Sequence, residues 1–223
     1  MPRIAIVEDH LLLAETLRAA LAQSEVSATI VPPAPLDELL SELRALQPEL
    51  VLLDLDLDRF GDSTPLIAPL VDSGVRVLLV TGTTERLRIA RALEQGAIGV
   101  HRKASGFVSL QAKALDALAA SVALDPEERV LLLAELSRWR VIQDRELAPF
   151  RRLTDREQST LRSLARGQTV TEIATDWVVA EATVRSHVRG VLTKLGVGSQ
   201  LAAVAAAQRS GWFASERVTT QAS

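Results

Sequence analysis

Five polar side chains follow short apolar runs in the first half of the chain, and their types suit the handling of a phosphoryl group. Glu8 and Asp9 follow RIAIV, Asp54 lies at the end of LVLLDL, Thr81 follows VRVLLV and Lys103 comes shortly after AIGV. Carboxylates gathered around one point repel each other unless a hard cation such as Mg²⁺ neutralises them. One carboxylate can then carry a phosphoryl group whose oxygens bind the cation, the ammonium and the hydroxyl.

The apolar runs are predicted to be strands that alternate with helices. The predicted strands are 3–7, 28–31, 50–55, 75–80 and 97–100, and the predicted helices are 11–22, 36–46, 84–95 and 109–122. Such alternation predicts an α/β doubly wound, five-stranded parallel sheet with helices on both faces. Because ligands bind at the carboxyl ends of the strands in such sheets, the five side chains are expected to converge there.

From Leu153 onward the pattern changes to short helices. Residues 154–157 and 169–172 are capping boxes that each open a helix, a third helix begins near Ala182, and a fourth spans 200–209. The apolar positions of the third helix are Val184, Val188, Val191 and Leu195, and the opposite face carries Arg185, Arg189 and Thr193 with Ser186 alongside. A helix with arginines on its exposed face can enter the major groove of DNA.

Charge is distributed unevenly along the 223 residues. Residues 1–120 carry 11 Lys and Arg against 16 Asp and Glu, residues 121–150 carry 4 against 6, and residues 151–223 carry 10 against 6. An acidic first part and a basic last part predict two domains with different partners, the second partner being a polyanion.

The composition excludes several classes of protein. Because the chain has no cysteine, it has no disulfides, thiolate metal sites or cysteine nucleophiles. No apolar run approaches the roughly 18 to 20 residues that span a bilayer, and the opening MPRIAIVEDH contains no signal-peptide core. We therefore expect a cytoplasmic protein without a membrane partner.

Together these motifs resemble the two-component response regulators of the NarL/FixJ type, which join a receiver domain to a LuxR-type helix-turn-helix domain. The receiver motifs are IVEDH (6–10), VLLDLDL (51–57), VTG (80–82) and GAIGVHRK (96–103). The LuxR-type motif is the run LTDREQSTLRSLARGQTVTEIATDWVVAEATVRSHVRGVLTKLGV (153–197). The resemblance covers nearly the whole chain.

The resemblance implies a role for each residue of the receiver site. Asp54 would be the phosphoryl acceptor, and Thr81 and Lys103 would sense the phosphoryl group. The implied Mg²⁺ ligands are the carboxylates of Glu8, Asp9 and Asp54 and the backbone carbonyl of Asp56. Phosphorylation by a sensor histidine kinase would then control dimerisation and sequence-specific DNA binding.

For the second domain the resemblance implies contacts with double-stranded DNA. The expected DNA-binding residues are Thr183, Arg185, Ser186, His187, Arg189 and Lys194. Arg185, early in the helix, is expected to read bases, and Lys194, near its end, to bind phosphate. A homodimer is expected, because such small domains usually need two copies to read related half-sites.

Two departures from the family pattern concern the receiver site. The run 57–61, Leu-Asp-Arg-Phe-Gly, stands where the family usually has a Met-Pro-Gly-type turn, and Val100 stands where it has a switch aromatic. His10 and His101 are interpreted as ordinary loop residues. In the DNA-binding half, Ala180 replaces a common Ser cap before the third helix.

These departures leave alternatives to the favoured function, a non-enzymatic transcription regulator controlled by phosphorylation. One alternative is a regulator of the same architecture that ignores phosphorylation. A remote alternative is a haloacid-dehalogenase-like phosphotransferase, because Asp54 and Asp56 have the spacing of its nucleophile and general acid.

The predicted domains are a receiver over 1–122, a linker helix over 123–150, the helix-turn-helix domain over 151–213 and a flexible tail over 214–223. Asp125-Pro126 starts the linker helix. Its apolar face, formed by Leu132, Leu136 and Trp139, either contacts a second copy or packs on the chain's own receiver.

Overall fold

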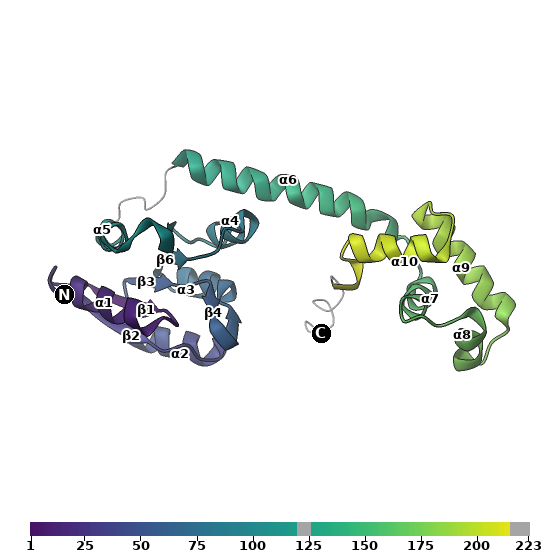
Figure 1. Ribbon diagram of the computed structural model, residues 1–223, viewed down its shortest axis with the longest axis horizontal. Helices are drawn as coiled ribbons and strands as arrows, with labels where there is room; N and C mark the ends of the chain where they lie inside the picture. Colours follow the sequence, from purple (N-terminus) through teal and green to yellow (C-terminus); the bar gives the residue numbers. More distant parts are fainter. Residues whose placement is uncertain (120–125, 215–223) are drawn as a thin grey trace. The chain divides into compact units, whose positions relative to one another are not determined.

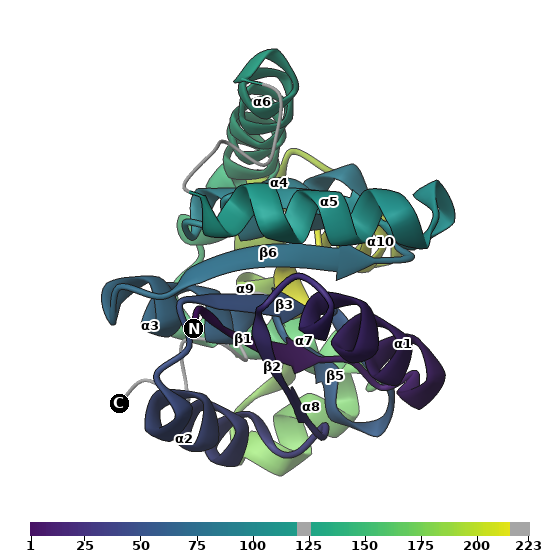
Figure 2. The ribbon, with the colours of Figure 1, turned by 90° about the vertical axis from the view of Figure 1, so that its left-hand side faces the viewer.

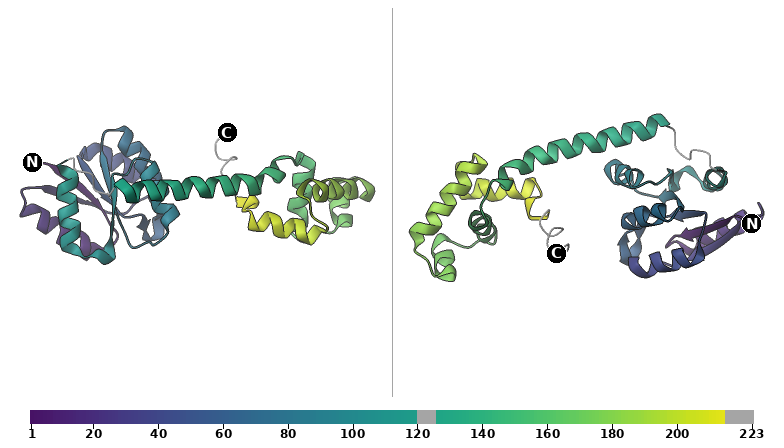
Figure 3. Two further views of the ribbon diagram at one scale, coloured as in Figure 1. Left: turned by 90° about the horizontal axis from the view of Figure 1, so that it is seen from above. Right: turned by 180° about the vertical axis from the view of Figure 1, so that it is seen from behind.

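The computed structural model describes residues 1–119 and 126–214. The chain divides into two compact units, Met1–Ser137 and Arg138–Ser223 (Figures 1 and 3). The predicted cap Asp125 and, beyond Ala214, the predicted tail lie outside the described residues.

The first unit is built on a five-stranded parallel sheet in the order β2-β1-β3-β6-β7 (Figure 2). The strands are β1 (Arg3–Val7), β2 (Ser27–Val31), β3 (Leu50–Leu53), β6 (Arg76–Thr81) and β7 (Gly99–Arg102). Leu50–Leu53 is buried along its whole length, as expected for a central strand covered on both faces. The predicted α/β sheet is confirmed.

Helices cover both faces of this sheet. The helices are α1 (Leu11–Ala22), α2 (Leu36–Leu46), α3 (Ile67–Asp72), α4 (Arg86–Glu94) and α5 (Phe107–Leu118). Leu17 of α1 and Leu110 of α5 share one core cluster with Ile4 and Ile6 of β1. Because successive strand residues point to opposite faces, Ala5 and Val7 face the other layer, where α2 and α3 contact each other.

Two details of the first unit differ from the prediction. The segment after β3 forms a small antiparallel hairpin, β4 (Asp56–Leu57) with β5 (Gly61–Asp62), joined by the 3₁₀ turn η1 (Asp58–Phe60). A second turn, η2 (Thr64–Leu66), leads into α3, and a third, η3 (Lys103–Ser105), follows β7. The interpretation of His101 as a loop residue is wrong, because it lies in β7 with only 1% of its surface exposed.

The first part of helix α6 (Pro126–Arg151) packs on α4 within the first unit. Leu132 and Leu136 are buried, and Arg129 donates hydrogen bonds to the carbonyls of Leu93 and Ala97 at 2.9 Å each. These carbonyls lie at the end of α4, where a cation is favourable. Of the two predicted uses of the apolar face, the structure shows packing on the chain's own receiver for Leu132 and Leu136, whereas Trp139 is half-buried and belongs to the second unit.

Beyond α6, the described part of the second unit contains four short helices, as predicted. They are α7 (Asp155–Ala165), α8 (Val170–Trp177), α9 (Glu181–Leu195) and α10 (Gln200–Arg209). Thr154 and Thr169 form complete capping boxes with Glu157 and Glu172, whereas Ala180 gives α9 no side-chain cap. One core of this unit contains Trp212, whose ring stacks on Phe150 at 5.6 Å.

Within the described parts of the chain, no single helix is long and apolar enough to cross a membrane. The bent pair formed by α9 and α10 meets that criterion by length and composition only.

Candidate functional site in the receiver and candidate DNA-binding helix

Three charged side chains meet at the carboxyl ends of β1, β3 and β7. The Nζ of Lys103 lies 2.6 Å from Oδ2 of Asp54 and 2.7 Å from Oε1 of Glu8. Asp54 and Glu8 are 3% and 5% exposed, so both carboxylates are nearly enclosed by protein. The parallel strands bring together residues that are 46 and 49 positions apart in the sequence.

The second acid of the opening pair lies at the same edge. Oδ1 of Asp9 is 2.6 Å from Nδ1 of His10, and that nitrogen is 2.9 Å from Oε1 of Glu8. One ligand atom from each of Glu8, Asp9, His10 and Asp54 lies within 4.8 Å of the others. Three carboxylates at this separation fit a hard divalent cation that keeps part of its water shell.

Burial is the main electrostatic feature of this site. Desolvation raises the pKa of both Glu8 and Asp54, although hydrogen bonds from Lys103 act in the opposite direction. Lys103 itself loses hydration, yet its hydrogen bonds to Asp54 and Glu8 raise its pKa overall. Lys103 therefore supplies positive charge to both of these carboxylates.

Thr81 ends β6, the strand beside β3, and is completely buried. Its Oγ1 accepts a hydrogen bond from the amide of Thr83 at 3.1 Å. Val100, at the predicted switch position in β7, is 4% exposed and part of the core. The side chain at position 100 is therefore a small apolar core residue rather than an aromatic group.

The hairpin of residues 56–62 is attached to both the site and α4. The hydroxyl of Ser63 donates to the carbonyl of Asp54 at 2.5 Å, and the amide of Asp56 donates to Oδ1 of Asp54 at 3.2 Å. On its outer side, Arg88 of α4 binds Asp56 and Asp62. The carboxylate of Asp56 thus pairs with an arginine of α4.

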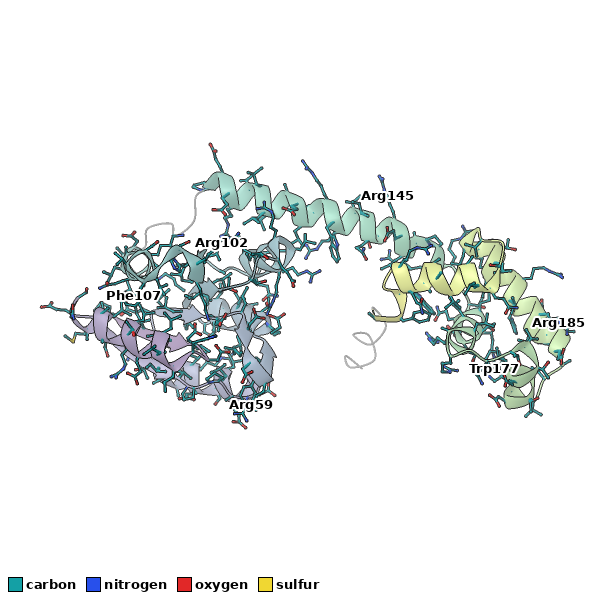
Figure 4. The ribbon with its side chains drawn as sticks, viewed as in Figure 1. Arg59, Arg102, Phe107, Arg145, Trp177 and Arg185 are labelled. Atoms are coloured by element: carbon teal, nitrogen blue, oxygen red, sulfur yellow. The ribbon has the colours of Figure 1, made fainter. Side chains whose placement is uncertain are left out.

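The predicted DNA-binding face of α9 is present as a polar surface. Val184, Val188 and Val191 are buried, whereas the expected DNA-binding residues on the other side are exposed: Thr183, Arg185, Ser186 and Arg189. Arg185 projects from the helix (Figure 4), with a side chain that is 67% exposed and paired to Glu181 one turn earlier. An exposed pair of this kind contributes little to stability, so the guanidinium is available to a ligand.

The remaining two predicted DNA-binding residues are engaged inside the second unit. Lys194 donates to Oε2 of Glu157 at 2.6 Å and its side chain is 29% exposed. His187 is half-buried, with its ring 6.5 Å from that of Trp177. Trp177 is itself half-buried and has the guanidinium of Arg156 at 5.3 Å, while Trp212 is a core residue.

Sequence reasoning missed Arg88 and the hairpin that it binds. The turn could have been inferred from Asp58 and Gly61, since Gly readily adopts a positive φ and Asp tolerates one, and their φ angles are +38° and +75°. The contact with Arg88 had no such local signal, because Arg88 lies 26 residues beyond Asp62.

A doubly wound sheet with this acidic site, followed by a helix-turn-helix unit, defines a signal-receiving, DNA-binding regulator. Residues 4–115 match the response regulator receiver domain, and residues 151–207 match the luxR family of bacterial regulatory proteins. The chain belongs to the response regulators and is a response regulator transcription factor with a LuxR-type DNA-binding domain.

The chain is also similar along most of its length to two curated transcriptional regulatory proteins. The chain is 32% identical over 211 residues to the probable transcriptional regulatory protein NarL of Mycobacterium tuberculosis, covering 93% of this chain and 94% of that one. It is 27% identical over 217 residues to the transcriptional regulatory protein LnrK of Bacillus subtilis, with 95% and 98% covered. Among solved structures, it resembles RcsB of Salmonella enterica serovar Typhimurium bound to promoter rprA, with a TM-score of 0.48, 24% identity and 92% and 98% covered.

Proposed function

We propose that Asp54 accepts a phosphoryl group from a sensor histidine kinase and that this modification controls the DNA-binding unit. The observation that carries the proposal is the enclosure of Asp54 at the sheet edge, with Lys103 at 2.6 Å and Glu8 beside it. A carboxylate oxygen of Asp54 forms a bond to phosphorus while the bond from phosphorus to the donor breaks, and the donor leaves with the electron pair.

The chain's own residues divide this task. Lys103 binds a phosphoryl oxygen in place of one carboxylate partner, and the Thr81 hydroxyl binds another. Glu8, Asp9, Asp54 and the backbone carbonyl of Asp56 would hold Mg²⁺, which when bound neutralises the gathered negative charge. The amide of Asp56, already 3.2 Å from Oδ1 of Asp54, helps to orient the acceptor.

Intact-mass analysis after treatment with a small phosphodonor and Mg²⁺ tests the proposal. One phosphoryl group is expected on the wild type and none on Asp54→Asn. Asp58→Asn is the matched control, because Asp58 is an exposed carboxylate on the same hairpin and should leave the modification unchanged. Absence of the group on the wild type would favour the phosphorylation-independent alternative, to which the apolar Val100 already points.

We propose further that α9 reads double-stranded DNA as a homodimer, with Thr183, Arg185, Ser186, His187, Arg189 and Lys194 as the contacting residues. The supporting observation is the exposed arginine-bearing face of α9. Arg185→Ala should weaken the preferred site by about 1–3 kcal/mol and leave scrambled DNA almost unaffected. Salt titrations on both duplexes measure this, and equal weakening of the two would contradict base reading by Arg185.

Lys194 separates two roles in the same titrations. As a phosphate contact, Lys194→Ala should weaken both duplexes alike and reduce the salt slope by about one unit. If Lys194 only pairs with Glu157, then Lys194→Ala should lower the stability of the second unit and leave the salt slope unchanged.

Phosphorylation is expected to favour the homodimer. Sedimentation with and without beryllofluoride and Mg²⁺ measures the change in oligomeric state. A chain that stays monomeric in both conditions and on DNA would contradict the dimer.

A further inference from the structure

Arg88 joins α4 to the hairpin that follows the acceptor strand. Its Nη1 donates to Oδ1 of Asp56 at 2.5 Å, and its Nη2 donates to the carbonyl of Leu55 at 2.5 Å and to Oδ1 of Asp62 at 2.9 Å. The side chain is 17% exposed, so the guanidinium is largely enclosed by these partners. A planar guanidinium that makes several bonds at once fixes both distance and orientation.

Arg88 binds the carbonyl of the peptide that links Leu55 to Asp56 and, next to it, the Asp56 carboxylate. The same stretch is attached to the site on its inner side, where the Asp56 amide meets Asp54 and the Ser63 hydroxyl meets the Asp54 carbonyl. The next carbonyl along the backbone belongs to Asp56, the implied metal ligand. Together with the Ser63 amide, which donates to the same Leu55 carbonyl at 3.1 Å, Arg88 restrains the peptide that precedes that carbonyl.

We propose that Arg88 is a positioning residue for the metal site, holding the Asp56 carbonyl toward the carboxylates of Glu8, Asp9 and Asp54. This inference rests on the proposed function, because it assumes that Mg²⁺ binds there. The contact between the hairpin and α4 and the binding of Mg²⁺ would then be thermodynamically coupled. If the contact through Arg88 strengthens metal binding, metal binding stabilises that contact by the same free energy.

Charge alone predicts the opposite result, which makes the proposal testable. Arg88 is a cation near a cation site, so its removal would tighten Mg²⁺ binding if its charge were all that mattered. If its geometry matters, its removal releases the hairpin and weakens binding. Groups that orient metal ligands from outside typically change affinity by about 10–100-fold when they are mutated.

The experiment is a calorimetric Mg²⁺ titration of the full chain, without a phosphodonor. Arg88→Ala should raise the Kd about tenfold, at the low end of that range because a backbone carbonyl is only one of several ligands. Arg88→Lys keeps the charge but loses the forked geometry, so its Kd should lie between those of wild type and Arg88→Ala. Arg86→Ala is the matched control: it removes an arginine from the same helix, whose partner is Glu135 rather than the hairpin, and should leave the Kd unchanged.

Backbone amide spectra of Asp56 and Leu57 accompany the titration, and they should shift in Arg88→Ala while the rest of the sheet stays as in wild type. An unchanged or lower Kd in Arg88→Ala, or a Kd of Arg88→Lys equal to that of wild type, overturns the proposal. If Arg88→Ala does not fold, the Arg88→Lys comparison decides. If the wild type binds no Mg²⁺ at millimolar concentration, the metal-dependent part of the proposed function and this inference are both overturned. If the wild type binds Mg²⁺ and the Arg88 variants have the same Kd, this inference alone is overturned.

Discussion

The pKa values of buried carboxyl groups are shifted in opposite directions in the two units. In the receiver, burial raises the pKa of Glu8 and Asp54, which means that the fold holds these groups in a place where their charged forms are disfavoured. In the helix-turn-helix unit, Glu157 is also buried, but hydrogen bonds from Lys194 and Thr154 outweigh desolvation and lower its pKa. Glu172, in the exposed capping box, has its pKa lowered by the backbone amide of Thr169.

The difference separates a site prepared for a ligand from a structural network. Glu157 accepts bonds from the Thr154 amide at 2.7 Å and from Lys194 at 2.6 Å, so its charge is fully used inside the protein. In the receiver, one Lys103 pairs with both Glu8 and Asp54, and burial still raises the pKa of the two carboxyl groups. Perturbed groups of this second kind are typical of functional sites.

The largest effect that tests this comparison is expected for Glu157→Ala. The change removes half of a capping box and leaves Lys194 partly buried without its carboxylate, so the second unit should lose about 2–4 kcal/mol of stability. Urea unfolding followed by tryptophan fluorescence measures this loss. The signal reports on the second unit because all three tryptophans, Trp139, Trp177 and Trp212, belong to it.

The control for this variant is Glu172→Ala, which breaks the other capping box on the surface and should destabilise less. The effect of Glu157 also has a pH sign. Since its folded pKa is depressed, its stabilisation is complete above the ordinary glutamate pKa and is lost as the pH falls through the folded value. Similar losses in both variants, or a loss that grows toward acid, would contradict the contrast between them.

A smaller loss is expected for Gly190→Ala. A Cβ at this position of α9 would lie 2.2 Å from Oε1 of Glu157, a carboxylate whose other oxygen, Oε2, is held by hydrogen bonds from Thr154 and Lys194. Overpacking should outweigh the helix propensity gained with alanine and destabilise the unit by about 1–2 kcal/mol. Gly198→Ala, where a Cβ meets nothing within 4 Å, is the control in the same fluorescence assay.

In the receiver, replacing a buried carboxylate should raise stability instead of lowering it. Asp54→Asn removes a carboxylate whose charged form is disfavoured by burial, and in metal-free buffer at neutral pH it should stabilise the first unit by about 1 kcal/mol. Because the folded pKa of Asp54 is raised, this gain should shrink as the pH falls toward the ordinary aspartate value. Calorimetry with a chelator present measures it, and a loss of stability would place Asp54 in the same structural class as Glu157.

The smallest effect is expected at the turn between α8 and α9, where the second unit has a strained backbone residue rather than a buried charge. Val178 is in the left-handed region, with φ 54° and ψ 48°, and is 90% exposed. Val178→Gly should therefore stabilise the unit by about 0.5–1 kcal/mol, and Val178→Ala by less. Thermal unfolding of the two variants checks this order.

Periodicity predicted most of the fold because the strands are short, apolar and buried on both faces. The observed β1 matches the predicted 3–7, and the predicted strand at 75–80 is observed one residue later, at Arg76–Thr81. Strand ends also indicated that Glu8, Asp54 and Lys103 meet, since parallel strands place such residues at one edge. The capping boxes of α7 and α8 were predicted because their signals are only three residues apart.

What could not be predicted depends on contacts between distant residues. Lys194 reads as an exposed cation near a helix end, and only the packing of α7 on α9 shows that Glu157 binds it. Arg88 falls on the polar side of an ordinary helical pattern, and its partners belong to a hairpin that no periodicity marks. Side-chain pairing across 26 to 37 positions is set by tertiary packing, which local patterns do not encode.

The missing cap of α9 has a consequence for the kinetics of its backbone. Thr154, Thr169 and Ser199 each accept a hydrogen bond from a first-turn amide of the helix that follows, whereas Ala180 offers no side-chain oxygen to α9. The earliest amides of α9 should consequently exchange their protons with solvent faster than the equivalent amides of α7, α8 and α10. The helix that carries Arg185 thus begins as the loosest of the four, and an anion that binds its first turn would slow that exchange.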